Sequence, residues 1–167
     1  MKSITMKSKY NSPIIVMGVA GCGKTTIGRL IAKKFNYVFF DADDFHSEAS
    51  IEKMKNGIPL NDEDRTYWLV KLNNILQQSI NKNEKMVLAC SALKERYRDV
   101  LSRDLSPTFI YLKISMTMAI SRLKRRKNHF FKPSLITDQF KNLEEPSNCI
   151  VIDANKPIDE ILQNFEP

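Results

Sequence analysis

The stretch that decides the fold lies at residues 18–25 and reads Gly18-Val19-Ala20-Gly21-Cys22-Gly23-Lys24-Thr25. It follows a short apolar run at residues 14–17 and opens a helical pattern that continues to Phe35. This is the pattern G-x-x-x-x-G-K-[ST] between a strand and a helix, the context in which it forms a phosphate-binding loop. Glycines let the backbone curl so that successive N–H groups point inward, and the amino end of the helix adds a positive field. The alternative is a glycine-rich turn that matches by chance.

The chemistry of this loop predicts particular contacts with a nucleotide. Lys24 reaches the β- and γ-phosphates, and the Thr25 hydroxyl is a ligand for Mg²⁺. Cys22 lies near a helix amino end, where a thiolate is favoured, so we expect thiol alkylation to slow activity and bound ATP to protect. The loop alone leaves open whether the phosphoryl group passes to water, to a protein or to a small molecule. The predicted nucleotide-binding residues of the loop are Gly18, Val19, Ala20, Gly21, Cys22, Gly23, Lys24, Thr25 and Thr26.

Size and composition indicate one globular domain. The chain has 167 residues, of which 43% are hydrophobic and 27% are charged, and such values are ordinary for a protein with a single core. We expect a flexible tail at residues 1–12 and one domain at residues 13–167, without a secretory signal or a membrane-spanning run of roughly 20 apolar residues. Cys22, Cys90 and Cys149 form no C-x-x-C pair, which argues against zinc and disulfides and favours a reduced, cytoplasmic setting.

The formal net charge of +7 indicates an anionic partner. Nucleic acid is one possibility, but the aromatic residues among the basic ones are limited to Phe130 and Phe131. A pocket for small anions accounts for the charge more economically, so we predict neither a nucleic-acid nor a membrane partner. Much of the excess lies at Arg122, Lys124, Arg125, Arg126, Lys127 and Lys132, with His129 among them.

Apolar runs alternate with amphipathic stretches along the chain. The predicted strands are residues 14–17, 37–40, 86–90, 109–112 and 149–152. The predicted helices are residues 24–35, 47–56, 62–81, 94–103, 116–126, 133–143 and 158–165. Strands that alternate with helices, and that are apolar on both faces, indicate an α/β fold with three layers: a five-stranded parallel sheet flanked by helices. Ligands of such sheets bind beyond the carboxyl ends of the strands.

Acidic residues follow the second apolar run, which continues as Asp41-Ala42-Asp43-Asp44-Phe45-His46. Side chains two apart in an extended segment point the same way, so we expect Asp41 and Asp43 to face the phosphate loop together. One carboxylate can hold Mg²⁺, and the other can accept the proton of an attacking hydroxyl. The alternative is that these acids cap the helix that begins near Ser47. His46 is a weak indication by itself, because an isolated histidine is more often a structural hydrogen-bonding group.

The third apolar run ends without the acidic residue that motor ATPases and GTPases usually carry there. This shifts the metal role toward Thr25 and Asp41. Further along, Lys94 and Arg98 are four residues apart, a spacing at which two side chains share a helix face and can bind an anionic substrate together. The alternative is a solvated basic face paired with neighbouring acids.

A second pair of basic residues, Arg122 and Arg126, has the same spacing after the fourth apolar run. Two arginines on one face suit phosphate oxygens, because each guanidinium can donate two parallel hydrogen bonds. A basic lid that closes over the nucleotide would also exclude water from the reaction. The alternatives are a solvated basic helix and a nucleic-acid patch.

From Ile14 to about Pro157, the chain resembles the bacterial-type gluconokinases, which are small P-loop kinases. The phosphate loop is common to a large superfamily, so the specific part of the resemblance lies in three other blocks. They read Gly57-Ile58-Pro59-Leu60-Asn61-Asp62-Glu63-Asp64-Arg65 followed by Trp68-Leu69, Cys90-Ser91-Ala92-Leu93-Lys94 with Tyr97-Arg98-Asp99, and His129-Phe130-Phe131. Shorter matches are Asp41-Ala42-Asp43 with His46, Gln139-Phe140, and Leu143-Glu144-Glu145-Pro146.

This resemblance implies ATP-dependent phosphorylation of D-gluconate at its 6-hydroxyl, with Mg²⁺. It also implies a shikimate-kinase-like fold, a mobile lid at about residues 122–143, and often a homodimer. The adenine is expected between the base of the lid and the loop after the last strand, near residues 153–157. Arg122 and Pro157 are accordingly predicted to bind the nucleotide. Combined with the chemistry above, the resemblance implies as catalytic residues Lys24, Asp43, Arg122 and Arg126. The substrate-binding residues that it implies are Asp43, His46, Arg65, Lys94, Arg98 and His129.

Two other classes of function stay open from the sequence. The first is another small-molecule kinase of the same fold, acting on shikimate or on a nucleoside monophosphate. Shikimate kinases, however, end the third strand in a glycine-rich loop, whereas this chain reads Cys90-Ser91-Ala92-Leu93-Lys94 there. The second is a nucleotide-binding module associated with nucleic acid through the basic segment.

Overall fold

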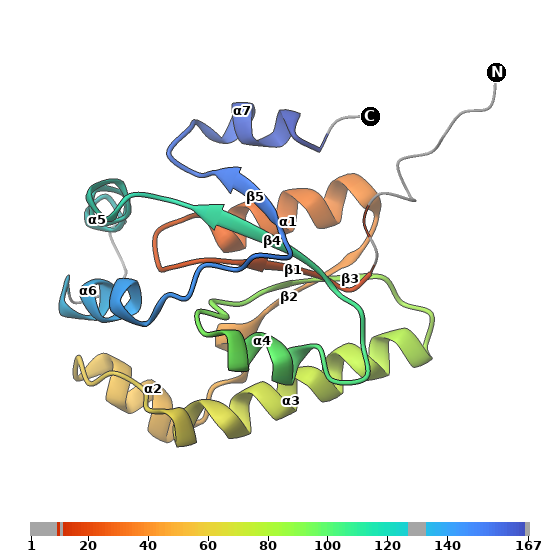
Figure 1. Cartoon of the computed structure of the whole chain (residues 1–167), viewed down its shortest axis with the longest axis horizontal. Helices are drawn as coiled ribbons and strands as arrows, with labels where there is room; N and C mark the ends of the chain where they lie inside the picture. Colours follow the sequence, from red (N-terminus) through yellow and green to blue (C-terminus); the bar gives the residue numbers. More distant parts are fainter. Residues whose placement is uncertain (1–9, 11, 127–132, 166–167) are drawn as a thin grey trace.

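The computed structural model describes residues 10, 12–126 and 133–165. A parallel sheet of five strands forms the middle layer, with the strand order β2-β3-β1-β4-β5 (Figure 1). Each strand begins and ends within one residue of the range predicted for it, and neighbouring strands pair in parallel, so the predicted parallel sheet is confirmed. The strands are β1 (Ile14–Met17), β2 (Val38–Asp41), β3 (Met86–Ala89), β4 (Thr108–Lys113) and β5 (Ile150–Asp153).

Helices α1 and α7 lie over one face of this sheet, and helices α3 and α4 lie over the other (Figure 1). On β1, Ile14 and Val16 belong to the core on the α1 side, whereas Ile15 and Met17 belong to the core on the α3 side. Successive side chains of a strand point to opposite faces, so a strand buried on both faces is apolar throughout. The helical elements are α1 (Lys24–Phe35), η2 (Ala42–Phe45, a 3₁₀ turn), α2 (Glu48–Lys55), α3 (Asp62–Asn81), α4 (Glu95–Leu101), α5 (Met116–Lys124), α6 (Pro133–Asn142) and α7 (Ile158–Gln163).

Local hydrogen bonds explain where the helices begin and end. Helix α3 has the predicted bounds because Asn61 and Asp64 form a reciprocal capping box at its amino end. Helix α4 is shorter than predicted, because Lys94 has an extended backbone and precedes the first turn. Helix α5 ends at Lys124, so that Arg126 lies beyond it.

The amino-terminal boundary of the domain differs from the predicted one. Tyr10 falls in the predicted tail, yet only 5% of it is exposed, and its ring lies 5.9 Å from Phe35 and 6.0 Å from Phe165. The domain therefore includes Tyr10, and the rest of the predicted tail, apart from Ser12, lies outside the described residues. Among the residues described, no helix is long and apolar enough to cross a membrane.

The carboxyl ends of the strands meet at one edge of the sheet. The phosphate loop follows β1 and η2 follows β2 at this edge, while α2, α5 and α6 lie beside it (Figure 1). This arrangement brings segments from four distant parts of the chain to the place where α/β sheets bind ligands.

Candidate functional site

The backbone of the phosphate loop has the curled shape that its glycines predict. Gly18, Gly21 and Gly23 have φ angles of 147°, 83° and 98°, a region that residues with a side chain rarely adopt. A Cβ atom on Gly21 would also lie 2.7 Å from the carbonyl oxygen of Ala119 on α5. The loop therefore packs directly against the backbone of α5, and only glycine fits between them.

Two side chains bind the outer part of this loop. The Lys24 ammonium donates a hydrogen bond to the Val19 carbonyl, with Nζ 3.0 Å from the oxygen. The Ala20 N–H donates to the side-chain oxygen of Gln139 on α6 over 2.7 Å. The loop is thus held in its curled form by its own lysine and by a helix that is distant in sequence.

Thr25 and Asp41 lie together, as the metal prediction requires. The Thr25 hydroxyl donates to Oδ2 of Asp41 over 2.6 Å, and Oδ1 of Asp41 accepts from the Asp43 N–H over 3.0 Å. Asp41 ends β2 in register with Ala89 of β3, so its carboxylate lies beside the strand end where the chain lacks an acid. Mg²⁺ is usually held by one or two protein oxygens together with phosphates and water. This pair of oxygen ligands fits that ion, although the described residues contain no cluster of three or more metal-binding side chains.

A cavity of about 630 Å³ opens at this edge of the sheet. It unites the phosphate loop, η2, the amino end of α3 and helix α6. The predicted site residues that line it are Ala20, Gly21, Gly23, Lys24, Thr25, Thr26, Asp41, Asp43, His46, Arg65 and Arg126. The lining residues that the sequence did not single out as functional are Met54, Pro59, Leu60, Trp68, Ser91, Leu135, Asp138 and Gln139.

Asp41 and Asp43 reach the cavity by a different route from the predicted one. The segment after Asp41 is the 3₁₀ turn η2 rather than an extended strand, and Asp41 caps this turn through the Asp43 N–H. The prediction of two acids at the cavity holds, but its geometric reason is wrong. The helix α2 is capped instead by Ser47, whose hydroxyl accepts from the Ser50 N–H. Neither Asp41 nor Asp43 is therefore the N-cap of α2, and both residues line the cavity.

His46 forms part of the cavity wall. Its ring stacks on Trp68 with 4.3 Å between the ring centres, and its Nε2 lies 3.7 Å from Oδ1 of Asp43. Trp68 in turn donates from Nε1 to the Ala42 carbonyl over 2.8 Å. The Nδ1 atom of His46 is buried without a hydrogen-bond partner among the described residues. His46 thus acts at least as a packed support for η2.

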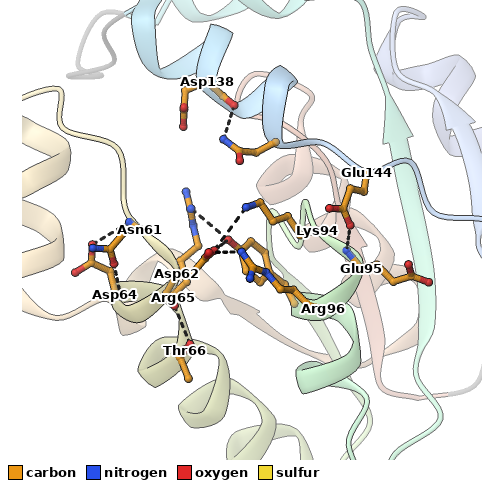
Figure 2. A network of polar contacts seen from close by, with 12 residues as sticks. Asn61, Asp62, Asp64, Arg65, Thr66, Lys94, Glu95, Arg96, Asp138 and Glu144 are labelled. Carbon is orange, nitrogen blue, oxygen red and sulfur yellow. Dashed lines mark hydrogen bonds and ion pairs between the residues drawn. The ribbon is translucent and has the colours of Figure 1, made fainter.

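A cluster of charges lies where α3 begins, next to the cavity (Figure 2). The Tyr97 hydroxyl donates to Asp62 over 2.6 Å and accepts from Arg65 at 3.4 Å. Lys94 lies 3.6 Å from the Asp62 carboxylate, and Arg96 forms a second ion pair with it. The hydrogen bond from Tyr97, aided by these two cations, holds the pKa of Asp62 below its ordinary value. Two cations thus pair with the Asp62 carboxylate, and a third, Arg65, contacts the Tyr97 hydroxyl and lines the cavity.

The predicted pairing of Lys94 with Arg98 on one helix face is wrong. Lys94 precedes α4, and its ammonium pairs with Asp62. Arg98 is only 8% exposed, and its guanidinium donates to the carbonyls of Ala92 and Leu93 over 2.8 and 3.1 Å. Neither residue is among the described ones that line the cavity. Through these bonds Arg98 stabilises the turn before α4, where Ala92 has a positive φ of 45°.

The two predicted lid arginines occupy different places. Arg126 lines the cavity, whereas Arg122 donates to the carbonyls of Cys22 and Lys156 at 3.5 and 3.2 Å. They do not share a helix face, because α5 ends before Arg126. Arg122 instead joins the phosphate loop to the segment before Pro157, the neighbourhood predicted for adenine. Residues 127–132 of the predicted lid, His129 among them, lie outside the described residues.

The structure contradicts an accessible thiol at Cys22. The residue is 0% exposed and lies in the core between the loop and β4. Cys90 is also buried, at 1% exposure, and burial raises the pKa of its thiol to about 12. The carbonyl and N–H of Cys22 belong to the loop, but its sulfur faces away from the cavity. The sequence could not reveal this, because the motif specifies the backbone of this position and not its neighbours.

Comparisons with known proteins agree with this geometry. A sequence model of the shikimate kinase family matches residues 20–163. A probable gluconokinase of Rattus norvegicus is 41% identical, over 89% of this chain and 92% of the relative. A sugar kinase from Janibacter sp. HTCC2649 has a similar structure, with a TM-score of 0.84, 38% identity, and 91% and 90% of the two chains covered. A gluconokinase from Sinorhizobium meliloti 1021 gives a TM-score of 0.80, 37% identity, and coverage of 90% and 86%. The chain therefore belongs to the shikimate kinase family and, within it, to the gluconokinases.

Proposed function

We propose that this kinase transfers the γ-phosphoryl group of ATP to the 6-hydroxyl of D-gluconate, giving 6-phosphogluconate and ADP. The observation that carries the proposal is that the phosphate loop, Asp43 and Arg65 line the same cavity. A phosphate donor, a proton acceptor and a partner for a carboxylate are the three groups that this reaction needs. The family membership supports the same substrate.

On the donor side, the loop amides and Lys24 bind the phosphates. Thr25 and Asp41 would hold Mg²⁺, which supplies charge neutralisation of the β- and γ-phosphate oxygens when it is bound. Arg126 lines the same cavity and adds a further positive charge near the transferred group. Arg122 contacts the segment before Pro157, which makes this segment the proposed adenine side.

On the acceptor side, Asp43 accepts the proton of the attacking hydroxyl. The hydroxyl oxygen forms a bond to the γ-phosphorus, the bond from that phosphorus to the β–γ bridging oxygen breaks, and ADP leaves. Arg65 binds the substrate carboxylate, because it is the cation of the Asp62–Tyr97 cluster that lines the cavity. A fixed distance between Asp43 and Arg65 then selects an acceptor whose hydroxyl and carboxylate lie at opposite ends.

Shikimate is the second candidate acceptor, because the matching family model is that of shikimate kinase. It is also a small hydroxylated carboxylic acid, so it shares the two functional groups that this site recognises. The two acceptors differ in shape, since gluconate is an open chain whereas shikimate is a ring. The pairing of Asp43 with Arg65 suits either gluconate or shikimate, whereas the gluconokinase relatives favour gluconate.

The decisive measurement is ADP release with Mg-ATP and a panel of acceptors. The panel contains gluconate, shikimate, other sugar acids, nucleoside monophosphates and a sample without acceptor. We expect turnover with gluconate and at most slow hydrolysis without acceptor. Turnover of another acceptor with none of gluconate would overturn the proposed substrate and leave the kinase assignment in place.

We also propose that the protein acts as a homodimer in the cytoplasm. The family resemblance supports the dimer, and the three free cysteines support a reducing compartment. Light scattering coupled to size-exclusion chromatography measures the mass directly. A mass of about 19.3 kDa, that of one chain, would rule out the dimer.

A further inference from the structure

Gln139 on α6 contacts the phosphate loop although it lies 119 residues away from it in the chain. Its Oε1 atom accepts a hydrogen bond from the Ala20 N–H over 2.7 Å. A backbone N–H can only donate, so the atom of Gln139 that faces Ala20 is its oxygen. The amide nitrogen is then the other arm of the carboxamide. Gln139 is partly exposed and lines the cavity, so that this arm is available to a ligand there.

The contact lies at the γ-phosphate end of the nucleotide site. Lys24, the residue that reaches the β- and γ-phosphates in loops of this kind, donates to the Val19 carbonyl over 3.0 Å. Gln139 binds the next residue of the loop, Ala20, so the carboxamide and the ammonium flank the same short segment. The adenine side, marked by Arg122 and the Lys156 carbonyl, is separate from this segment. A donor on Gln139 is therefore near the group that is transferred.

We propose that Gln139 donates a hydrogen bond from Nε2 to the γ-phosphoryl group during its transfer, an inference that rests on the kinase reaction proposed above. The transferred group carries its charge on three oxygens, and donors fixed in advance stabilise such charge most. The bond from Ala20 holds the carboxamide in place before a nucleotide binds and also polarises its NH₂ group. Helix α6 thus contributes a catalytic residue, in addition to covering the cavity.

Two substitutions separate this role from that of a structural link between α6 and the loop. Gln139→Glu keeps an oxygen that accepts from Ala20 N–H but replaces the NH₂ donor with a second, negatively charged oxygen. Gln139→Leu removes both functions at similar size. Thr137→Ala is the matched control, because Thr137 is exposed on the same helix. Steady-state kcat is measured with gluconate and Mg-ATP, and the Kd of ADP, which lacks the γ-phosphate, is measured by calorimetry.

We expect both Gln139 variants to lower kcat by about 10- to 10³-fold, the range for the loss of one preorganised donor. The Kd of ADP should change by less than about threefold, because the bonds to the β-phosphate stay. Thr137→Ala should match the wild type in both measurements. Wild-type kcat in Gln139→Glu, or a loss of ADP affinity that parallels the loss of kcat, would overturn the proposal in favour of a structural link.

The outcome does not depend on the identity of the acceptor. If the wild type phosphorylates another acid in the panel instead of gluconate, the same variants are compared with that acid. Gln139 acts on the phosphoryl donor, so the same loss of kcat is expected with any acceptor that is turned over. A failure of the gluconate assignment and a failure of the Gln139 assignment therefore give different results.

Discussion

Asp41 and Asp43 illustrate how single residues divide the work of this site. Each oxygen of the Asp41 carboxylate accepts one hydrogen bond, from the Thr25 hydroxyl and from the Asp43 N–H. The side chain of Asp43 is 82% exposed at the cavity, with its Oδ1 3.7 Å from Nε2 of His46. A bound carboxylate suits a fixed metal ligand, whereas an exposed one suits a group that must meet a substrate hydroxyl.

Asp43→Asn tests this division at the residue scale. We expect kcat to fall by about 10²-fold or more, because the amide cannot accept the hydroxyl proton. Asp44→Asn is the control, since Asp44 is an exposed acid of the same 3₁₀ turn that does not line the cavity. Circular dichroism should show both variants folded. A kcat for Asp43→Asn close to that of Asp44→Asn would reduce Asp43 to a structural acid.

Burial at Cys22 and Cys90 leads to a second prediction at this scale. Cys149 is the most accessible of the three thiols, although partial burial raises its pKa as well. Under iodoacetamide, Cys149 should react first, and Cys22 should react at least about tenfold more slowly because the structure must open to expose it. Peptide mass spectrometry over time measures both rates. Equal rates for Cys22 and Cys149 in the folded protein would contradict the buried position.

At the scale of elements, the acceptor side depends on how α2, α3 and α4 meet. Helix α3 brings Arg65 to the cavity, and Tyr97 of α4 holds Asp62 and Arg65 from behind. Lys53 of α2 pairs with Asp64 through both carboxylate oxygens, each 2.8 Å away. The amino end of α3 is therefore fixed by contacts with two other helices, which orients its arginine.

Tyr97→Phe tests the contact between α3 and α4. The variant keeps the ring but loses the hydroxyl that Asp62 and Arg65 share. The KM for gluconate should rise by about 2- to 10-fold, the equivalent of one hydrogen bond, while kcat and the KM for ATP stay nearly constant. Tyr67→Phe is the control, because Tyr67 lies on α3, the helix of Asp62 and Arg65, and is 73% exposed. An equal rise in both KM values would indicate a general distortion instead.

The ion pair between Lys53 of α2 and Asp64 of α3 should make the stability of the protein depend on pH. The hydrogen bond from Lys53, followed by that from the Asn61 N–H, lowers the pKa of Asp64 from its ordinary value of 3.8. A pKa that is lower in the folded state than in the unfolded state stabilises the folded protein at pH values above the unfolded-state pKa. This stabilisation is lost as the pH falls through the folded-state pKa. Asp64→Ala should lower the free energy of unfolding by about 1 kcal/mol at pH 7, as the loss of a helix cap does.

The difference between wild type and Asp64→Ala should shrink as the pH falls below about 4. Urea unfolding at pH 7, 5, 4 and 3 measures it at each step. Glu63→Ala is the control, because Glu63 is an exposed acid in the same first turn. A difference that is constant from pH 7 to pH 3 would contradict an ionised, ion-paired Asp64.

At the scale of the whole molecule, the cavity is lined by residues from several helices and loops rather than by one element. It exists because a parallel sheet places the carboxyl ends of its strands at one edge, and because helices α2, α5 and α6 lie beside that edge (Figure 1). The phosphate loop is continuous with the cores on both faces through β1. Nucleotide binding should therefore stabilise the entire domain against unfolding.

Thermal unfolding measures this coupling. Mg-ATP at 100 times its Kd adds about 2.7 kcal/mol to the free energy of unfolding, which corresponds to a rise in Tm of about 5–10 °C for a domain of this size. Lys24→Ala should reduce the rise at the same ATP concentration, because it loses a main phosphate contact. A Tm that Mg-ATP leaves unchanged would mean that the loop opens independently of the rest of the domain.

Local patterns in the sequence were enough for the sheet, for the phosphate loop and for the neighbourhood of Thr25 and Asp41. The reason is that glycine spacing, apolar runs and capping residues act over a few neighbours in the chain, as the capping box of Asn61 and Asp64 does. Arg65, which lines the cavity, was implied as a substrate-binding residue only by the family resemblance, and its contact with Tyr97 was not predicted.

Tertiary structure alone decided the direction in which side chains point. The spacing of Lys94 and Arg98 predicts a shared helix face. It does not predict that the helix begins after Lys94, or that Arg98 is buried and donates to two backbone carbonyls. Cys22 faces the core and Gln139 faces the phosphate loop for the same reason. Their surroundings come from segments up to 119 residues away, and no local pattern of residue types encodes contacts that only the packing of distant elements creates.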